Sequence, residues 1–312
     1  MKAVFLDRGS FPKHIKIELP NSIDDVVFYD NTAAENVIER IQDADIVLSN
    51  KVVLNEEAIH RANSLKLIQV MATGTNNVNI NACQERNVCV QNVTDYSTIS
   101  VPEHTFAMLL ALRRNLTSYV DAVKSKRWAD SEHFCFLDYP IKDLSGSTMT
   151  IIGGGTLGKK VAHIAHAFGM DVIFAERKNA TEVRDGYLSF RQAIQSADII
   201  SINCPLTDET KDLISEVEFS LMKQSCLLLN ISRGGIVDEK ALVDALKNLK
   251  ISGAAFDVAT QEPMPEDHPL QSLTELPNFL LTPHIAWASD EAMQTLVNLA
   301  MKKITAFIDS SL

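Results

Sequence analysis

The sequence predicts an α/β protein that contains two doubly wound parallel sheets. Short apolar runs rich in β-branched residues alternate with helical stretches along almost the whole chain, a pattern typical of parallel strands joined by helical crossovers. A glycine-rich turn follows one of these runs near the middle of the chain. With 312 residues, 46% of them hydrophobic, the chain exceeds what a single core usually accommodates, so we expect two domains.

The N-terminal part of the chain predicts the strands of a first sheet. Apolar runs lie at residues 2–7, 26–30, 45–49, 67–71 and 88–91. Because helical stretches separate these runs, we expect them to pair as parallel strands.

A long amphipathic stretch extends from Ser100 to about Lys124. It opens with Ser100-Val101-Pro102-Glu103, which has the pattern of a capping box with proline in the first helical turn. We expect one helix that bridges the two domains. Its apolar face is long enough to pair with a second subunit and comprises Val101, Phe106, Leu109, Leu110 and Leu116.

A second alternation begins after Leu144-Ser145-Gly146 and predicts a second sheet. Its expected strands lie near residues 148–152, 171–175, 198–203, 226–231, 252–256 and 279–281. Residues 289–309 have the pattern of one more helix, which we expect to pack back on the first domain. The predicted layout is a discontinuous domain of residues 1–99 and 288–312, with a domain of residues 100–287 inserted into it.

Charge and composition argue against several classes of partner. The net charge is −11, and the longest basic cluster is the short run of Lys124, Lys126 and Arg127, which is too little to track a nucleic-acid backbone. The apolar run at the N-terminus stops at Asp7, and no stretch approaches the roughly 18 apolar residues of a membrane span. We therefore expect a cytoplasmic protein with neither a nucleic-acid nor a membrane partner.

The cysteines favour neither a disulfide framework nor a metal site. They are odd in number and contain no Cys-x-x-Cys pair. We therefore expect free thiols that bind no metal at Cys83, Cys89, Cys135, Cys204 and Cys226.

The glycine-rich turn has the G-x-G-x-x-G pattern of a Rossmann dinucleotide-binding motif. Gly153-Gly154-Gly155-Thr156-Leu157-Gly158 follows the apolar strand and opens a helical stretch. In such a turn Gly153 permits the tight bend, Gly155 lets the backbone approach a pyrophosphate, and Gly158 allows close packing of helix and strand. We expect the N–H groups of Thr156 and Leu157 to bind the phosphates. The alternative is a purely structural turn.

The next strand delivers an acidic residue where the adenosine ribose would lie. Glu176 can accept hydrogen bonds from both ribose hydroxyls and disfavours a 2′-phosphate, so the sequence favours NAD. Arg177 and Lys178 follow at once and could pair with that phosphate, which leaves NADP open. The alternative for these two cations is a solvated loop.

Three chemically active side chains follow successive predicted strands of the second sheet, which is where ligands bind in open α/β sheets. They are Arg233, Glu262 and His284. The forked guanidinium of Arg233 suits a substrate carboxylate, although an arginine at such a place is commonly a surface ion pair.

His284 follows Thr282-Pro283, where the proline stiffens the approach to the imidazole. Histidine titrates near neutral pH and can deliver the proton that reduction of a 2-keto acid requires. Glu262 would orient this imidazole and favour its charged form. A structural histidine is the alternative here, and we assign His163 and His166 to structure.

Several separated segments together resemble the D-isomer-specific 2-hydroxyacid dehydrogenases. They are the glycine motif, Asn230-Ile231-Ser232-Arg233-Gly234-Gly235-Ile236-Val237-Asp238-Glu239, the 257–263 segment and Thr282-Pro283-His284. The resemblance covers essentially the whole chain. It implies a Rossmann cofactor domain inserted into a flavodoxin-like substrate domain, with Arg233 as substrate anchor, His284 as acid and base, and Glu262 as its partner. Further cofactor contacts are implied for Arg177, Cys204, Pro205, Thr210, Ile231, Ser232, Arg233, Asp257, His284 and Ala286.

Two segments narrow the resemblance to the glycerate dehydrogenase, or hydroxypyruvate reductase, branch. They are Ala72-Thr73-Gly74-Thr75-Asn76-Asn77-Val78 and the stretch from Trp128 to Pro140. The branch implies that backbone N–H groups of Ala72, Thr73 and Gly74 bind the substrate carboxylate, whereas the alternative is a plain turn. One departure is Gly154, because this branch often has a non-glycine residue at that position.

The sequence therefore predicts an enzyme that reduces hydroxypyruvate or glyoxylate with NADH, or oxidises D-glycerate in reverse. The resemblance implies a homodimer. Two other dehydrogenase types stay open, those for D-3-phosphoglycerate and for D-lactate. A non-catalytic NAD-sensing protein similar to the co-repressors of this fold is the alternative from another class.

Overall fold

The computed structural model describes residues 1–311. The chain forms two compact units, one of Met1–Ser97 together with the segment from Ala288, and one of Thr98–Trp287. We call them the split unit and the inserted unit. The first boundary lies two residues before the one we expect at 99/100. No helix of the described residues is long and apolar enough to cross a membrane.

The split unit contains a parallel sheet with the strand order β2-β1-β3-β4-β5. This is the order of flavodoxin-like folds, which agrees with the fold class expected from the sequence. Its strands are β1 (Lys2–Phe5), β2 (Asp25–Phe28), β3 (Ile46–Ser49), β4 (Leu67–Val70) and β5 (Cys89–Gln91). Its helices are α1 (Val37–Ile41), α2 (Glu56–Arg61), α3 (Ile80–Glu85) and α10 (Asp290–Ser311), with 3-10 turns η1 (Arg8–Ser10) and η2 (Ala34–Asn36).

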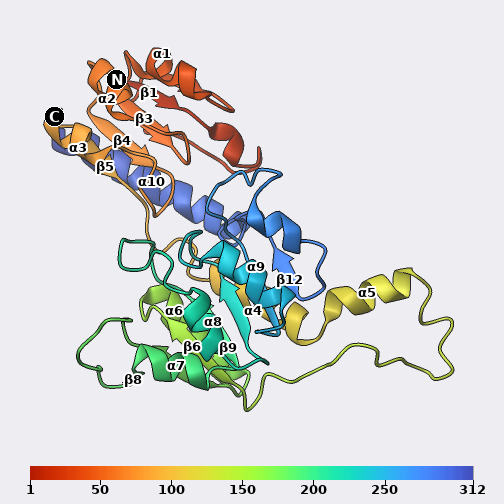
Figure 1. Cartoon of the computed structure of the whole chain (residues 1–312). Helices are drawn as coiled ribbons and strands as arrows, with labels where there is room; N and C mark the ends of the chain where they lie inside the picture. The colour runs from red at the N-terminus through yellow and green to blue at the C-terminus, as the bar shows by residue number, and fades with distance from the viewer. Residues whose placement is uncertain (312) are drawn as a thin grey trace. The chain divides into compact units, whose positions relative to one another are not determined.

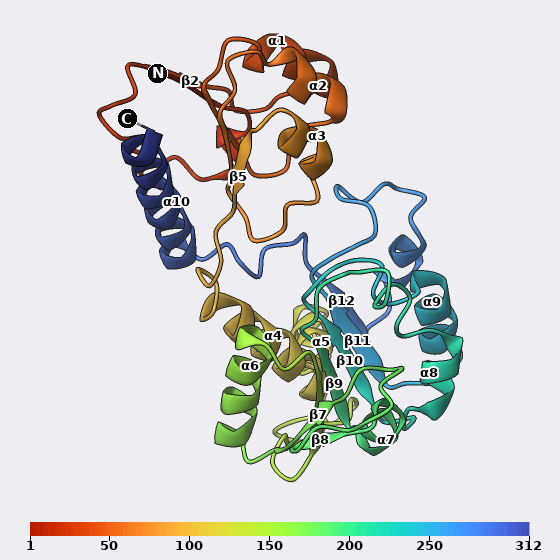
Figure 2. The same cartoon turned by 90° about the vertical axis from the view of Figure 1, so that its left-hand side faces the viewer.

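Helices cover both faces of this sheet, as the continuous apolar strands require. Figure 2 shows α1, α2 and α3 on one side of the unit and α10 on the other. Val4, Val47 and Ile68 form a core with the first three helices, while neighbouring strand residues such as Phe5 and Leu48 are buried on the opposite face.

The inserted unit contains a second parallel sheet with the order β12-β11-β10-β9-β6-β7-β8. From β6 the next strands, β7 and β8, are added on one side, whereas β9 to β12 are added on the other side. The boundary between β6 and β9 is therefore the switch point of a Rossmann fold. Its strands are β6 (Thr148–Ile152), β7 (Asp171–Ala175), β8 (Tyr187–Leu188), β9 (Ile199–Ile202), β10 (Leu227–Asn230), β11 (Gly253–Phe256) and β12 (Phe279–Leu281). The two-residue strand β8 was not expected, because so short a run carries no periodicity.

Two apolar cores cover the two faces of this sheet. Ile199 packs with α4 (Ser100–Arg113) and α6 (Thr156–Ala167), whereas its neighbour Ile200 packs with α7 (Phe190–Ser196), α8 (Glu216–Leu221), α9 (Glu239–Lys247) and η3 (Pro269–Leu273). Figure 2 shows α6 on one side of the sheet and α8 and α9 on the other.

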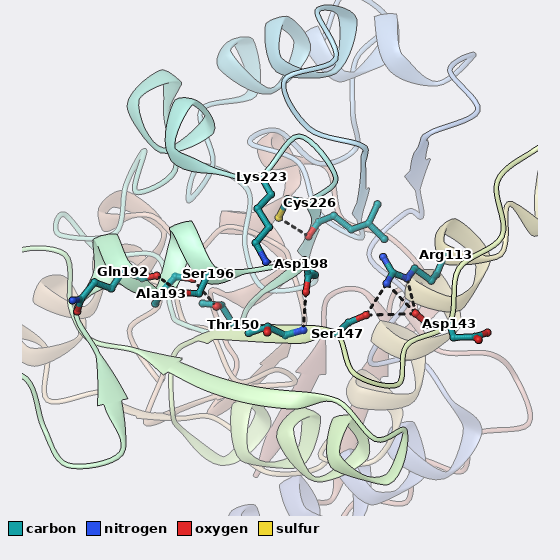
Figure 3. A network of polar contacts seen from close by, with 12 residues as sticks. Arg113, Asp143, Ser147, Thr150, Gln192, Ala193, Ser196, Asp198, Lys223 and Cys226 are labelled. Carbon is teal, nitrogen blue, oxygen red and sulfur yellow. Dashed lines mark hydrogen bonds and ion pairs between the residues drawn. The ribbon is translucent and has the colours of Figure 1, made fainter.

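Polar side chains tie the amino ends of these strands together (Figure 3). The Asp198 carboxylate accepts the Thr148 N–H at 2.9 Å and the Lys223 ammonium at 2.9 Å. Further along β6, the buried Thr150 hydroxyl donates to the Ala193 carbonyl of α7 at 2.8 Å. The Asp198 contacts lie at the amino edge of the sheet, whereas ligands of open α/β sheets bind at the carboxyl edge.

The single helix expected from Ser100 to Lys124 is wrong. The chain breaks it at Asn115, which has a left-handed backbone with φ +47°, so that α4 ends at Arg113 and α5 spans Leu116–Lys124. The expected capping box is also wrong. The N-cap residue is Ile99, and Ser100 lies inside the first turn, where its side chain makes no cap hydrogen bond.

The apolar face assigned to this helix belongs mostly to the core of its own unit. Val101, Phe106 and Leu109 are buried there, and Leu110 packs against them. Leu116, on α5, is exposed. Therefore α4 does not offer this face to a second subunit.

Candidate active site

The glycine motif forms the turn between β6 and α6. Gly153 has φ +102°, and a Cβ there would lie 2.7 Å from the Asn203 carbonyl oxygen, so only glycine fits. A Cβ on Gly158 would collide with the Gly153 carbonyl, whereas one on Gly155 would meet no protein atom within 4 Å. The space beside Gly155 and the uncapped start of α6 at Thr156 and Leu157 fit a pyrophosphate.

A cavity of about 950 Å³ lies along the carboxyl ends of β6, β7 and β9. Its volume suits a dinucleotide. Seven of the residues predicted to contact the cofactor line it, namely Gly153, Gly155, Glu176, Arg177, Cys204, Pro205 and Thr210.

The loop after β9 is held by its own polar groups. The Thr210 hydroxyl donates to the Pro205 carbonyl at 2.7 Å and accepts the Thr207 N–H at 2.7 Å. The Cys204 carbonyl accepts the Ser232 hydroxyl, which ties this loop to the one after β10. Burial raises the pKa of the Cys204 thiol to about 11, so this cysteine is a poor nucleophile at neutral pH.

Glu176 lies at the end of β7, but its carboxylate is already engaged. Its side chain is 5% exposed and accepts two bonds from Arg184, Nε–H at 2.6 Å and Nη2–H at 2.8 Å. The backbone N–H groups of Arg177 and Arg184 donate to it at 2.8 Å and 3.3 Å. The Arg184 guanidinium is the main cause that lowers the pKa of Glu176 to about 2.

The two cations that follow Glu176 differ in their surroundings. Lys178 pairs with the buried Glu218 at 2.8 Å and donates to the Leu213 carbonyl at 3.2 Å, so its ammonium is already used. Arg177 is exposed and lines the cavity. Sequence reasoning missed Arg184, because nothing in the local pattern shows that a residue eight positions further on turns back to Glu176.

His284 and Glu262 form the closest imidazole–carboxylate pair of the inserted unit. Nδ1 of His284 lies 2.6 Å from Oε2 of Glu262, and both side chains are partly exposed. The other carboxylate oxygen accepts the Ala259 N–H at 3.1 Å. Since a carboxylate only accepts hydrogen bonds, the proton of this contact belongs to Nδ1, which leaves Nε2 for chemistry.

Asp257, predicted as a cofactor contact, has protein partners on both oxygens. It is fully buried and accepts the Thr282 hydroxyl at 2.6 Å and the N–H groups of Ile285 and Ala286 at 2.9 Å and 2.8 Å. These bonds hold the turn in which His284 has φ +55°. The structure thus places this carboxylate inside the turn that presents the imidazole.

His104 of α4 supports the same turn and was not singled out from the sequence. Its Nε2 lies 3.0 Å from the Thr282 hydroxyl and 3.7 Å from the Asp257 carboxylate. Its distance in sequence from the His284 segment explains why no local pattern pointed to it.

Arg233 follows β10, in line with the other two catalytic candidates. Asn230 at the end of β10 pairs with Phe256 of β11, which pairs with Leu281 of β12, so three adjacent strands end at the same level. The Arg233 guanidinium donates to the Ser232 carbonyl at 2.7 Å. Because the strands are in register, Arg233, Glu262 and His284 follow the carboxyl ends of three neighbouring strands.

Close packing joins the loops after β10 and β11. A Cβ on Gly234 would collide with the backbone of Ala259 and Thr260. The buried Glu239 carboxylate accepts the N–H and the hydroxyl of Thr260 at 2.8 Å and 2.7 Å. The loop that carries Glu262 is therefore fastened to the loop that carries Arg233.

The remaining predicted residues have varied environments. Ile231 and Ala286 are buried against the core of the inserted unit. In the split unit, Ala72, Thr73 and Gly74 follow β4, and the Thr73 hydroxyl donates to the Val93 carbonyl at 2.9 Å. Among residues 1–311, no group of three or more histidine, cysteine or acidic side chains could hold a metal ion.

Comparison with known proteins agrees with this geometry. Residues 106–286 match the family model described as D-isomer specific 2-hydroxyacid dehydrogenase, NAD binding domain. The chain belongs to this family. Its chemistry is therefore NAD(P)-dependent oxidation and reduction at the CH–OH group of 2-hydroxy acids.

Relatives and solved structures extend the match to the whole chain. The glycerate dehydrogenase of Methylorubrum extorquens is 40% identical over 311 residues, covering 98% of this chain and 96% of the relative. The hydroxypyruvate reductase of Blautia hydrogenotrophica is 33% identical and covers 100% and 98%. The D-lactate dehydrogenase of Aquifex aeolicus, solved with NAD and lactic acid, has a TM-score of 0.84 at 26% identity, covering 99% and 96%. The two-domain fold and the NAD-binding domain are thus those of the family.

Proposed function

We propose that this dehydrogenase reduces hydroxypyruvate or glyoxylate with NADH, and oxidises D-glycerate in reverse. The His284–Glu262 pair at 2.6 Å carries the proposal, because it offers a proton donor at the sheet edge where Arg233 also emerges. The choice of substrate is supported by the similarity to a glycerate dehydrogenase and to a hydroxypyruvate reductase over nearly their full lengths.

Arg233, His284 and Glu262 each have a separate role in the proposed reduction. Bound NADH supplies the hydride that reaches C2 of the keto acid. Arg233 binds the substrate carboxylate through its guanidinium fork and polarises the neighbouring carbonyl. Nε2 of His284 delivers the proton to the carbonyl oxygen, while Glu262 accepts a hydrogen bond from Nδ1 and so fixes the orientation of the ring.

We assign two further sets of contacts in the same proposal. Backbone N–H groups of Ala72, Thr73 and Gly74, in the segment after β4, bind the substrate carboxylate, as the resemblance to the glycerate dehydrogenase branch implies. The start of α6 at Thr156 and Leu157 binds the pyrophosphate, and the loops after β9 and β10 line the rest of the cofactor site.

The test is a panel of 2-keto acids at fixed NADH, followed by absorbance of the reduced nucleotide. We expect the highest kcat/KM for hydroxypyruvate. A higher value for pyruvate or for 3-phosphohydroxypyruvate would instead favour a D-lactate or D-3-phosphoglycerate type of enzyme. NADH binding without turnover of any keto acid would favour the NAD-sensing, co-repressor-like alternative.

We also propose a homodimer, formed through α5 and the segment that follows it. Figure 1 shows this part of the inserted unit projecting away from its sheet. It exposes large apolar side chains, among them Phe134 at 89% and Leu137 at 76%. Because apolar side chains gathered on a projecting arm are typical of an interface, a second copy of this chain is the partner we propose.

Light scattering on a sizing column tests this interface. We expect a dimer for the native protein and monomers for the double variant Phe134→Ser and Leu137→Ser. The matched control is Val217→Ser on α8, which is also exposed and lies outside the arm. A monomeric native protein, or a double variant that stays dimeric, contradicts this interface.

A further inference from the structure

The Glu176 carboxylate has no lone pair left for a ribose hydroxyl. A carboxylate offers about four acceptor sites. Arg184 occupies two of them with its guanidinium, and the N–H groups of Arg177 and Arg184 occupy the others. The residue expected to bind the ribose and reject a 2′-phosphate is therefore neutralised by a cation.

Arg184 is supported on an aromatic platform. Its guanidinium carbon lies 4.0 Å from the centre of the Tyr187 ring, and that ring packs against Phe174 at 5.5 Å between centres. A planar cation over an aromatic face is a favourable arrangement that also limits its rotation.

Gly154 makes room for this platform. A Cβ at this position would collide with the hydroxyl of Tyr187. The glycine that departs from the pattern of the branch thus has a physical reason, because any larger residue would displace Tyr187 and with it the support of Arg184.

The part of the Arg184 guanidinium that does not contact Glu176 is suited to bind a phosphate group. Its side chain is 59% exposed and lines the cofactor cavity together with Arg177. Only two of its five N–H donors are used by Glu176, so the others can bind a phosphate while the ion pair persists. Acidic residues also line the cavity, at Glu182 and Glu209, so the charge is mixed.

We propose that Arg184 is the residue that sets cofactor choice, and that it binds the 2′-phosphate of NADPH together with Arg177. The neutralised Glu176 no longer repels this phosphate, so the enzyme accepts NADPH as well as NADH. Lys178, the other cation after β7, takes no part, because Glu218 holds it.

Calorimetric titration of NADH, NADPH and the fragment 2′,5′-ADP tests this assignment without relying on turnover. We expect the native protein to bind NADPH within about tenfold of NADH. Arg184→Gln should lower the affinity for NADPH and for 2′,5′-ADP by about tenfold or more, because a charge-assisted contact is lost. The affinity for NADH should stay the same or rise. The matched control is Arg191→Gln, an exposed arginine on α7 outside the cavity lining.

Two more variants probe the platform and the carboxylate. Gly154→Ala should lower the affinity for NADPH relative to NADH, as Arg184→Gln does, because the added methyl group displaces Tyr187. Glu176→Gln should tighten NADPH binding, because the positive charge of Arg184 is then no longer offset by a carboxylate. The proposal would be overturned if Arg184→Gln changed the affinities for NADH and NADPH equally, or if the native protein bound NADH but not NADPH.

Discussion

Two carboxylates follow strands of the same sheet at the same edge, yet their partners differ. Glu262, after β11, contacts an imidazole from the end of β12, whereas Glu176, after β7, is saturated by a guanidinium eight residues further along the chain. Histidine gains and loses a proton near neutral pH, but arginine stays charged. The first pair can therefore take part in proton transfer, and the second is a fixed charge arrangement.

Replacing the imidazole should have the largest effect. His284→Ala should lower kcat for keto-acid reduction by about 100- to 10,000-fold at every pH, because the proton donor is lost. Nucleotide affinity, measured by fluorescence titration, should stay within a few-fold of the native value. A variant with near-native kcat would remove His284 from the proposed mechanism.

Loss of the substrate anchor, Arg233, should have the second-largest effect on activity. Arg233→Ala should raise the barrier in kcat/KM by about 2–4 kcal/mol, since the guanidinium both binds the carboxylate and polarises the carbonyl. Arg233→Lys keeps the charge but not the fork and should recover only part of the loss. Steady-state kinetics with hydroxypyruvate measures both, and unchanged kcat/KM in Arg233→Ala would place the anchor elsewhere.

Replacing each carboxylate in turn sharpens the contrast between the two. Glu262→Gln keeps the size of the side chain but removes the acceptor oxygen 2.6 Å from Nδ1 of His284, so kcat for keto-acid reduction should fall while nucleotide affinity stays near the native value. Glu176→Gln is the comparison variant and should change the ratio of NADPH to NADH affinity instead. If kcat does not fall in Glu262→Gln while substrate and cofactor still bind, another group holds the imidazole.

The smallest effect should be on stability in acid. The pKa of Glu176 falls from 4.5 to about 2 because Arg184 donates to its charged form. A lowered pKa stabilises the fold fully above pH 4.5, and this contribution is lost as the pH falls toward 2. Thermal unfolding should therefore show a small Tm gap between the native protein and Glu176→Gln at pH 6 that closes near pH 2. The gap stays small because the guanidinium is exposed to solvent.

Much of the fold follows from local sequence. Apolar runs near the expected positions form the strands of both sheets, because a strand buried on both faces needs continuous apolar residues. The glycine motif is equally local, since the turn at Gly153 and the contact at Gly158 exclude a side chain. The break at Asn115 was not predicted, because the apolar pattern continues through it while the backbone changes direction.

The partners of the site residues were decided by tertiary structure. The sequence points to the Glu262–His284 pair only through the order of strands and the family resemblance. It gives no sign that Arg184 turns back to Glu176, that Tyr187 needs Gly154, or that Asp257 lies inside the His284 turn. Residue type and strand order depend on the chain alone, whereas hydrogen-bond partners depend on which side chains packing brings within about 3 Å of each other.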